Sequence, residues 1–108
     1  MTDQPILVLI TAPSQEVARQ IAATLLEQKL AACVNVLPGV RSYYTWKGAP
    51  QEDEEVLLLV KTRAALFEGG LVPAVKAVHP YELPEIIAVP IQMGLEGYLN
   101  WINEETGG

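Results

Sequence analysis

Hydrophobic residues follow two different spacings along the chain, and each spacing predicts one kind of element. Short apolar runs, typical of buried strands, occupy residues 5–11, 31–37, 56–61 and 86–91. Apolar positions at helical spacing occupy residues 14–28, about 62–78 and about 95–102. The pattern therefore predicts strand, helix, strand, strand, helix and strand, followed by a short final helix.

The second predicted strand continues beyond its apolar run. Pro38 and Gly39 are expected to bend it or to form a bulge rather than to end it. Residues 40–47 then alternate with a period of two and are rich in aromatic and β-branched side chains, which favours a continued strand. Because aromatic residues occur on both faces of this extension, we expect a partner subunit to cover it.

The segments on either side of the third predicted strand contain signals for a turn and for a helix start. Residues 47–50 form a predicted turn, and the four carboxylates at 52–55 are interpreted as the solvated end of the hairpin. Thr62 is expected to cap the second helix. The glycines and the proline between 69 and 73 either kink that helix or end a first turn near Gly69, after which a new helix has Pro73 in its first turn.

The order of the elements predicts an α+β protein with a ferredoxin-like fold. In this split βαβ arrangement an antiparallel sheet carries its helices on one face, and the short C-terminal helix is an addition to it. The chain has the length of one domain and contains no repeat or linker, so residues 1–108 are expected to form a single domain.

The charge of the chain narrows the possible partners. Thirteen acidic and seven basic residues give a net charge of -6, which disfavours binding to nucleic acids or to anionic membrane surfaces. A single cysteine excludes an intrachain disulfide and fits a reducing compartment. The start of the sequence has no basic leader, and no apolar run is long enough to span a membrane. We therefore expect a cytoplasmic protein.

The stretch 78–86 concentrates the chemically versatile side chains. It holds the only histidine, His79, between the second predicted helix and the fourth predicted strand. Prolines at 80 and 84 fix the backbone and keep the preceding residues extended, so this connector should be stiff. It is either a rigid structural link or a binding segment that presents an imidazole, a phenol and two carboxylates.

Metal binding would use His79 and Cys33, whose imidazole and thiolate are good ligands for copper and zinc. One chain supplies one histidine and one cysteine, too few for a tetrahedral site of soft ligands. A site would therefore need several copies of the chain, or His79 together with Glu82, Glu85 or a neighbour's carboxylate. The structural alternatives are a hydrogen-bonded connector histidine and a small buried strand cysteine.

Catalysis would have to use Cys33 as a nucleophile and His79 as its base. No motif supplies an oxyanion hole, a third orienting group or a glycine-rich phosphate loop. We therefore expect no enzymatic activity and no organic cofactor.

Binding of a small ligand is a further use of the same region. Lys61, near the end of a predicted buried strand, could pair with Glu85 or hold an anionic ligand. Tyr81 and Glu82 could line the same cleft. The structural alternative for Lys61 is a surface lysine that closes its strand.

Five motifs, taken in order, resemble the CutA family of divalent-cation tolerance proteins. Each motif is weak alone, but together, at matching spacing, they extend over nearly the whole chain. They are Ile10-Thr11-Ala12-Pro13, Leu30-Ala31-Ala32-Cys33-Val34-Asn35, Ser42-Tyr43-Tyr44-Thr45-Trp46-Lys47-Gly48, Lys61-Thr62, and His79-Pro80-Tyr81-Glu82 followed by Pro84-Glu85-Ile86.

The resemblance implies a tight homotrimer of ferredoxin-like subunits in which the long second strand pairs across subunits. It also implies a role in tolerance of copper and other divalent metals. The trimer shape is similar to that of the nitrogen-regulatory PII signalling proteins, which bind small molecules between subunits. Some members of the family carry a cysteine where this chain has Ile10, and some carry a histidine where it has Val78, so this chain has fewer of the soft ligands that the resemblance implies.

The sequence therefore predicts a homotrimer that responds to divalent cations. Weak binding of copper, or of another divalent metal, would be centred on His79, with Cys33 as a secondary ligand. The alternative is a PII-like signalling or small-ligand module that binds between subunits and has no metal function of its own. For that module the candidate ligand-binding residues are Lys61, Tyr81, Glu82 and Glu85.

Overall fold

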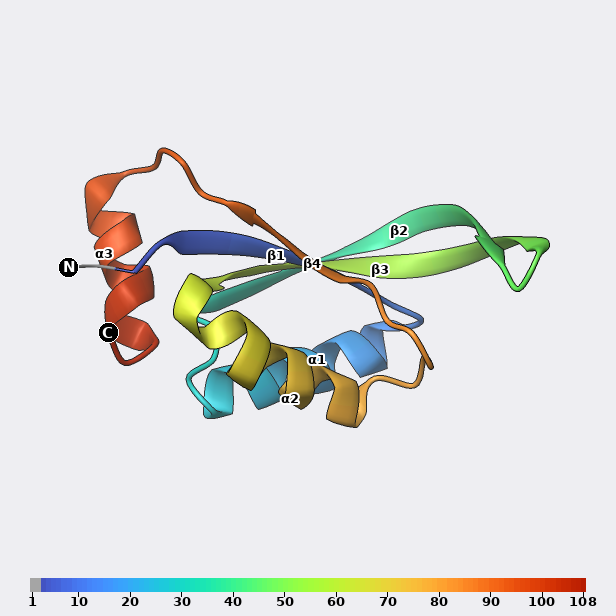
Figure 1. Ribbon diagram of the computed structural model, residues 1–108, viewed down its shortest axis with the longest axis horizontal. Coiled ribbons are helices and arrows are strands. Elements are labelled where there is room, and N and C mark those ends of the chain that lie inside the picture. Colours follow the sequence, from blue (N-terminus) through green and yellow to red (C-terminus); the bar gives the residue numbers. More distant parts are fainter. Residues whose placement is uncertain (1–2) are drawn as a thin grey trace.

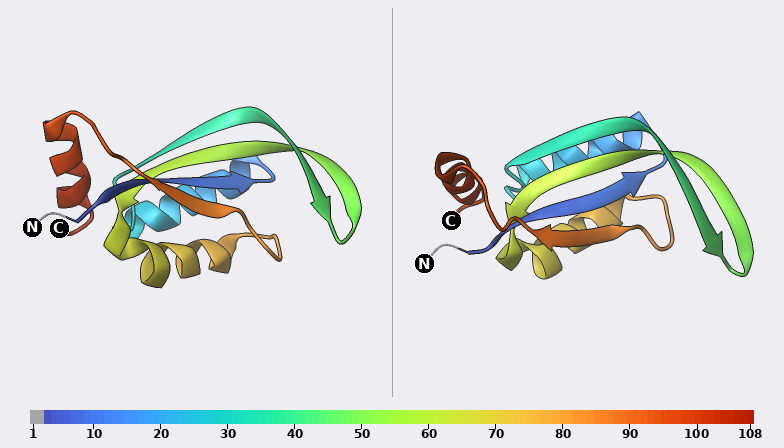
Figure 2. Two further views of the ribbon diagram at one scale, coloured as in Figure 1. Left: turned by 45° about the horizontal axis from the view of Figure 1, so that its top comes forward. Right: turned by 90° about the horizontal axis from the view of Figure 1, so that it is seen from above.

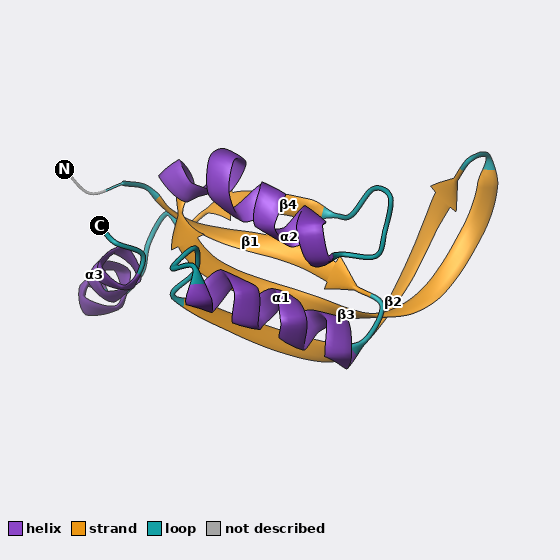
Figure 3. Ribbon diagram, turned by 90° about the horizontal axis from the view of Figure 1, so that it is seen from below, coloured by secondary structure: helices purple, strands orange, loops and turns teal. Residues whose placement is uncertain are grey.

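Two helices cover one face of a four-stranded antiparallel sheet in the computed structural model, which describes residues 3–108 (Figure 1). The strands are ordered β2-β3-β1-β4, and α1 and α2 lie across the same face (Figure 3). The elements are β1 (Pro5–Ala12), α1 (Gln15–Glu27), β2 (Cys33–Trp46), β3 (Ala49–Arg63), α2 (Val72–Val78), β4 (Ile86–Pro90) and α3 (Glu96–Glu105). This architecture confirms the predicted α+β fold.

The third helix, α3, lies apart from the other two, beyond the end of the sheet where the chain begins (Figure 1). Among residues 3–108, no helix is both long and apolar enough to cross a membrane. The fourth strand is an edge strand that ends at Pro90, where a missing N–H is tolerated.

The core lies between the sheet and the first two helices. Alternate residues of β1 and β3 point towards the helices, and Val8, Ile10, Leu58 and Val60 are completely buried there. The register places Val8 opposite Val60 and Ile10 opposite Leu58. The predicted apolar stripe of α1 packs on this layer through Ala18, Ile21 and Leu25.

The opposite face of the sheet, here called the open face, is not covered by any helix of the described chain (Figure 1). Its side chains alternate with those of the core and are mostly aliphatic. Leu37, Ile87 and Val89 are 42%, 51% and 44% exposed. The apolar runs predicted that β1 and β3 are buried strands. A single chain buries these strands on one face only. The open face consists of Leu7, Leu9, Leu37, Leu57, Leu59, Ile87 and Val89.

Beyond the sheet, β2 and β3 continue as a twisted two-stranded arm (Figure 2). The predicted bulge occurs between Leu37 and Val40, where Gly39 has a φ of 80°. The arm ends in a two-residue turn at Lys47 and Gly48, with φ values of 51° and 78°. It gives the molecule its longest dimension, 46 Å.

The predicted start of the third strand is wrong. This strand begins at Ala49 rather than at Val56, and its four carboxylates at 52–55 pair with residues 40–43 of β2. They therefore lie within the arm and not at a loose hairpin end. The β-branched and aromatic residues of β2 favour pairing strongly enough to include these poor strand formers.

The two helical starts follow different rules. Ser14 caps α1, because its hydroxyl oxygen accepts the N–H of Val17 at 3.2 Å. The predicted cap of the second helix is wrong, since Thr62 is still paired in β3 and its side chain is completely buried. A carboxylate oxygen of Asp3 accepts the N–H of Ala65 at 2.6 Å instead.

The helical segment between β3 and β4 is irregular. A 3₁₀ turn (Ala64–Leu66) and a π turn (Phe67–Leu71) precede α2. Gly70 lies against Leu30, whose Cδ2 would be 2.6 Å from an added Cβ. Pro73 lies in the first turn of α2, where its missing N–H costs no helical hydrogen bond. The π turn continues directly into α2, which begins at Val72, so the helical segment is irregular between Gly69 and Pro73 but is not interrupted there.

Replacement of Leu58 by alanine tests the position of the core. Leu58 is completely buried, so the variant should lose about 2–5 kcal/mol of unfolding free energy through lost contacts and a cavity. Leu26→Ala is the matched control, because Leu26 is 47% exposed on α1. Urea unfolding at one protein concentration measures both, and equal losses would contradict this core.

Candidate functional site

The connector between α2 and β4 is fixed to the sheet by His79. The imidazole is buried, and its Nε2 lies 2.7 Å from the carbonyl oxygen of Thr11 at the end of β1. Because a carbonyl only accepts, Nε2 carries the proton and donates it. The other ring nitrogen, Nδ1, accepts the backbone N–H of Tyr81 at 3.2 Å. Both nitrogens therefore hold the connector in place.

Tyr81 links the connector to the arm. Its ring packs at a tilt against the imidazole of His79, with 4.8 Å between the ring centroids. Its hydroxyl donates to Oε2 of Glu55 on β3 at 2.8 Å. Burial raises the pKa of Tyr81 well above its usual range, and the hydrogen bond to Glu55 raises the pKa further.

A cavity of about 500 Å³ opens between the connector and the arm. Three of the predicted ligand-binding residues, Tyr81, Glu82 and Glu85, lie in its wall. The remaining lining residues are Thr11, Tyr44, Trp46, Glu55, Pro80 and Leu83.

The arm contributes cavity residues that the sequence analysis did not identify as ligands. Tyr44 and Trp46 come from β2, and Glu55 comes from the carboxylate run in β3. The hydroxyl of Tyr44 donates to Asp53, and this hydrogen bond raises the pKa of Tyr44. The period of two in residues 40–47 was a signal that Tyr44 and Trp46 share one face of the strand.

The fourth predicted ligand-binding residue, Lys61, lies elsewhere. It is paired with Cys33 across β2 and β3, its Nζ lies 4.0 Å from the Cys33 sulfur, and it also contacts the side-chain oxygen of Asn35. Lys61 lies opposite Leu7 of β1. Leu7 is four positions before Thr11, whose carbonyl oxygen is bonded to His79. At a rise of about 3.3 Å per residue, the two places are roughly 13 Å apart along the sheet.

The predicted metal ligands are therefore separated within one chain. His79 is at one end of β1, whereas Cys33 lies beside Lys61 near the other end. Within residues 3–108, no three histidine, cysteine, aspartate or glutamate side chains are placed to hold a metal ion together. A single subunit thus does not fit a complete copper or zinc site, and it does not form a Cys–His catalytic pair.

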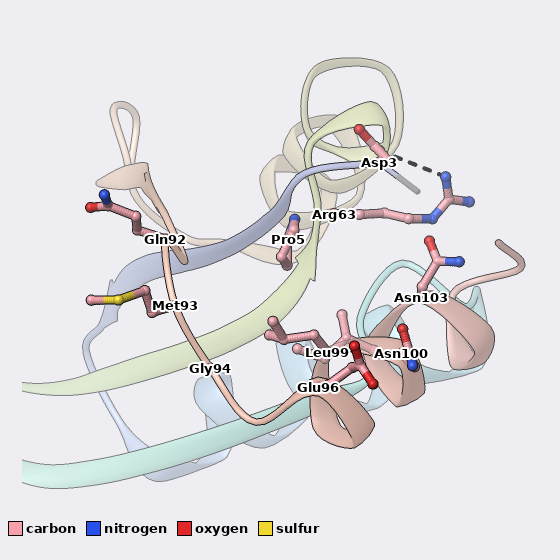
Figure 4. A pocket seen from close by; sticks show the side chains of 11 residues that line it. Asp3, Pro5, Arg63, Gln92, Met93, Gly94, Glu96, Leu99, Asn100 and Asn103 are labelled. Atoms are coloured by element: carbon pink, nitrogen blue, oxygen red, sulfur yellow. Dashed lines mark ion pairs between the residues drawn. The ribbon is translucent and has the colours of Figure 1, made fainter. Parts of the chain in front are cut away.

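A second cavity of about 380 Å³ lies between α3 and the start of β1 (Figure 4). Its basic residue, Arg63, already has partners within the chain. Arg63 donates to the hydroxyl and to the carbonyl oxygen of Thr106 at 3.0 and 2.8 Å, and it pairs with Asp3 at 3.7 Å. These contacts explain how α3 is attached to the sheet, so we treat this cavity as structural.

Comparisons with known proteins agree on one family. The family model described as CutA1 divalent ion tolerance protein matches residues 6–105. The "Divalent-cation tolerance protein CutA" of Thermus thermophilus is 56% identical over 100 residues, which cover 93% of this chain and 96% of that protein. "Protein CutA" of Mus musculus is 44% identical over 97 residues, which cover 90% of this chain but 54% of the mouse protein. The chain thus spans about half the length of that relative.

Solved structures give the same result for the fold. The divalent cation tolerance protein of Thermus thermophilus superimposes with a TM-score of 0.92 at 54% identity, covering 95% of this chain and 99% of that chain. CutA1 from Oryza sativa has a TM-score of 0.91 at 43% identity, covering 96% and 94% of the two chains.

Replacement of Tyr81 by phenylalanine tests the link between the connector and the arm. The variant leaves the buried Glu55 carboxylate without its hydroxyl donor, so the unfolding free energy near neutral pH should fall by about 1–3 kcal/mol. Tyr43→Phe is the control, because Tyr43 is 70% exposed on the same strand as Tyr44.

The raised pKa of Tyr81 also predicts a pH dependence. Because the folded protein holds this proton more tightly than the unfolded chain, its stabilising effect is complete below about pH 10 and is lost as the pH rises through the folded pKa. Urea unfolding measured from neutral to alkaline pH should show a shallower decline for Tyr81→Phe than for the wild type. Identical slopes would contradict the raised pKa.

Proposed function

Because the chain belongs to the CutA1 divalent ion tolerance family, we propose that it acts in divalent-cation tolerance as a homotrimer that binds copper or another divalent metal weakly. The observation that carries the assembly is the open face, an aliphatic sheet surface that residues 3–108 of one chain leave uncovered. A surface of this kind is typical of a subunit interface. The edge strand β2, 14 residues long, is the element that would pair across subunits.

The metal would be bound by ligands from more than one subunit. One chain offers no group of three suitable side chains within residues 3–108, and both nitrogens of His79 are already hydrogen-bonded. An ion at His79 would have to use Nδ1 and displace the N–H of Tyr81. Such competition supports weak rather than tight binding.

A small-ligand function is the second candidate, and the cavity beside the connector favours it. The cavity is of a size suited to a small molecule, and it contains three of the residues predicted for this role. The protein would then act as a binding module and not as an enzyme, which agrees with the separation of Cys33 from His79.

Assembly through the open face is tested by replacing Ile87 with arginine. An unpaired guanidinium buried within an aliphatic interface should convert the trimer into monomers. Leu26→Arg is the control, because Leu26 is exposed to a similar extent on α1, away from the open face. Light scattering gives the mass of each variant. An Ile87→Arg trimer would exclude the open face as the interface.

Native mass spectrometry with copper(II) tests whether the metal site depends on assembly. The wild-type trimer should take up a defined number of ions, and the Ile87→Arg monomer should take up none. His79→Gln should reduce uptake by the trimer. Equal uptake by the monomer would place the site within one chain, and unchanged uptake by His79→Gln would remove His79 from it.

A further inference from the structure

The walls of the cavity beside the connector combine aromatic rings with carboxylates. The rings are those of Tyr44, Trp46 and Tyr81, and carboxylates of three glutamates lie among them. No lysine or arginine is among the lining residues. Ring faces and carboxylates both attract cations, so the lining favours a positively charged ligand over an anionic one such as a nucleotide.

Glu55 is the most informative member of this lining. It is only 5% exposed, yet no lysine, arginine or histidine within residues 3–108 forms an ion pair with it. Among the described hydrogen bonds, its carboxylate accepts one, from Tyr81 to Oε2. Its second oxygen is not a fully buried atom, so it can be reached from the cavity, and a cation there would give this carboxylate the charged partner that it lacks within residues 3–108.

The side chain of Lys47 shows which groups at this cavity contact an ammonium group. The Nζ of Lys47 lies 5.6 Å from the ring centroid of Trp46 and 3.8 Å from Oε2 of Glu82. The side chain of Lys47 is 71% exposed, so this contact is weak and readily exchanged. The mouth of the cavity is therefore an ammonium position formed by a ring and a carboxylate.

We propose that this cavity binds an aliphatic diamine or a longer polyamine, which deepens the small-ligand function proposed above. One ammonium group would replace that of Lys47 between Trp46 and Glu82, and the other would reach the free oxygen of Glu55. The methylene chain between them would pack on the ring of Tyr81. A divalent metal fits less well, because the three glutamates do not converge on one point.

Isothermal titration calorimetry with putrescine on the wild-type protein tests this proposal. Butylamine, which has one ammonium group, should bind on the order of tenfold more weakly, because one charge-assisted contact is lost. The neutral 1,4-butanediol should not bind. Equal affinity for the diol and the diamine, or no heat with putrescine, would overturn the proposal.

Three variants locate the site. Glu55→Gln and Glu82→Gln should each weaken putrescine binding by roughly tenfold, since each removes one carboxylate partner. Lys47→Asn should strengthen it by about threefold, because the internal competitor is gone while asparagine still accepts the positive φ of the turn. Glu54→Gln is the control, because Glu54 is a neighbouring exposed glutamate outside the lining.

The results separate this proposal from the trimer and metal functions. The cavity is formed within one chain, so the Ile87→Arg monomer should still bind putrescine. A wild-type trimer that takes up copper but not putrescine would overturn the diamine site alone. Putrescine binding that is unchanged in Glu55→Gln and Glu82→Gln would overturn it as well, by placing the amine elsewhere.

Discussion

The antiparallel pairing of β2 with β3 is the interaction on which the rest of the structure depends. It runs from Cys33 opposite Lys61 to Trp46 opposite Ala49, far beyond the end of β1. Within the sheet, this pairing completes the layer that the helices cover. Beyond the sheet, the same pairing forms the arm. No helix of the described chain covers the arm, so its side chains are available to the connector on one side and to other molecules on the other. One pairing thus gives both the core and the candidate site.

The connector determines what the arm can bind. His79 is tied to the end of β1 through Thr11, and it positions the backbone and the ring of Tyr81. Tyr81 in turn holds the carboxylate of Glu55, which is only 5% exposed. The stiffness that Pro80 gives to the connector keeps this chain of contacts in one arrangement. The cavity is therefore preorganised, and a ligand would not have to order it.

The sequence predicted the elements that local patterns determine. The period of two along β2, the helical stripe of α1 and the bulge at Gly39 were all identified correctly, because each depends on near neighbours. The capping role of Thr62 failed because pairing with β1 extends one strand past the expected helix start. Tyr81 was recognised from its proline-rich surroundings. Glu55 was missed because its partner is 26 positions away and the twist of the arm brings them together.

His79 is both a candidate metal ligand and the residue that positions Tyr81. A metal-binding experiment on a His79 variant therefore has two interpretations. Replacement of His79 should reduce metal uptake by the protein whether the imidazole binds the ion or only positions Tyr81. The reason is that removal of the imidazole also releases the backbone of Tyr81, whose hydroxyl holds the carboxylate of Glu55. Tyr81→Phe separates the two cases, since it keeps the imidazole and removes only the hydroxyl bond to Glu55. If copper uptake falls equally in both variants, the wall rather than the imidazole governs binding, and His79 acts through Tyr81. If uptake falls only with His79, the imidazole itself contacts the ion.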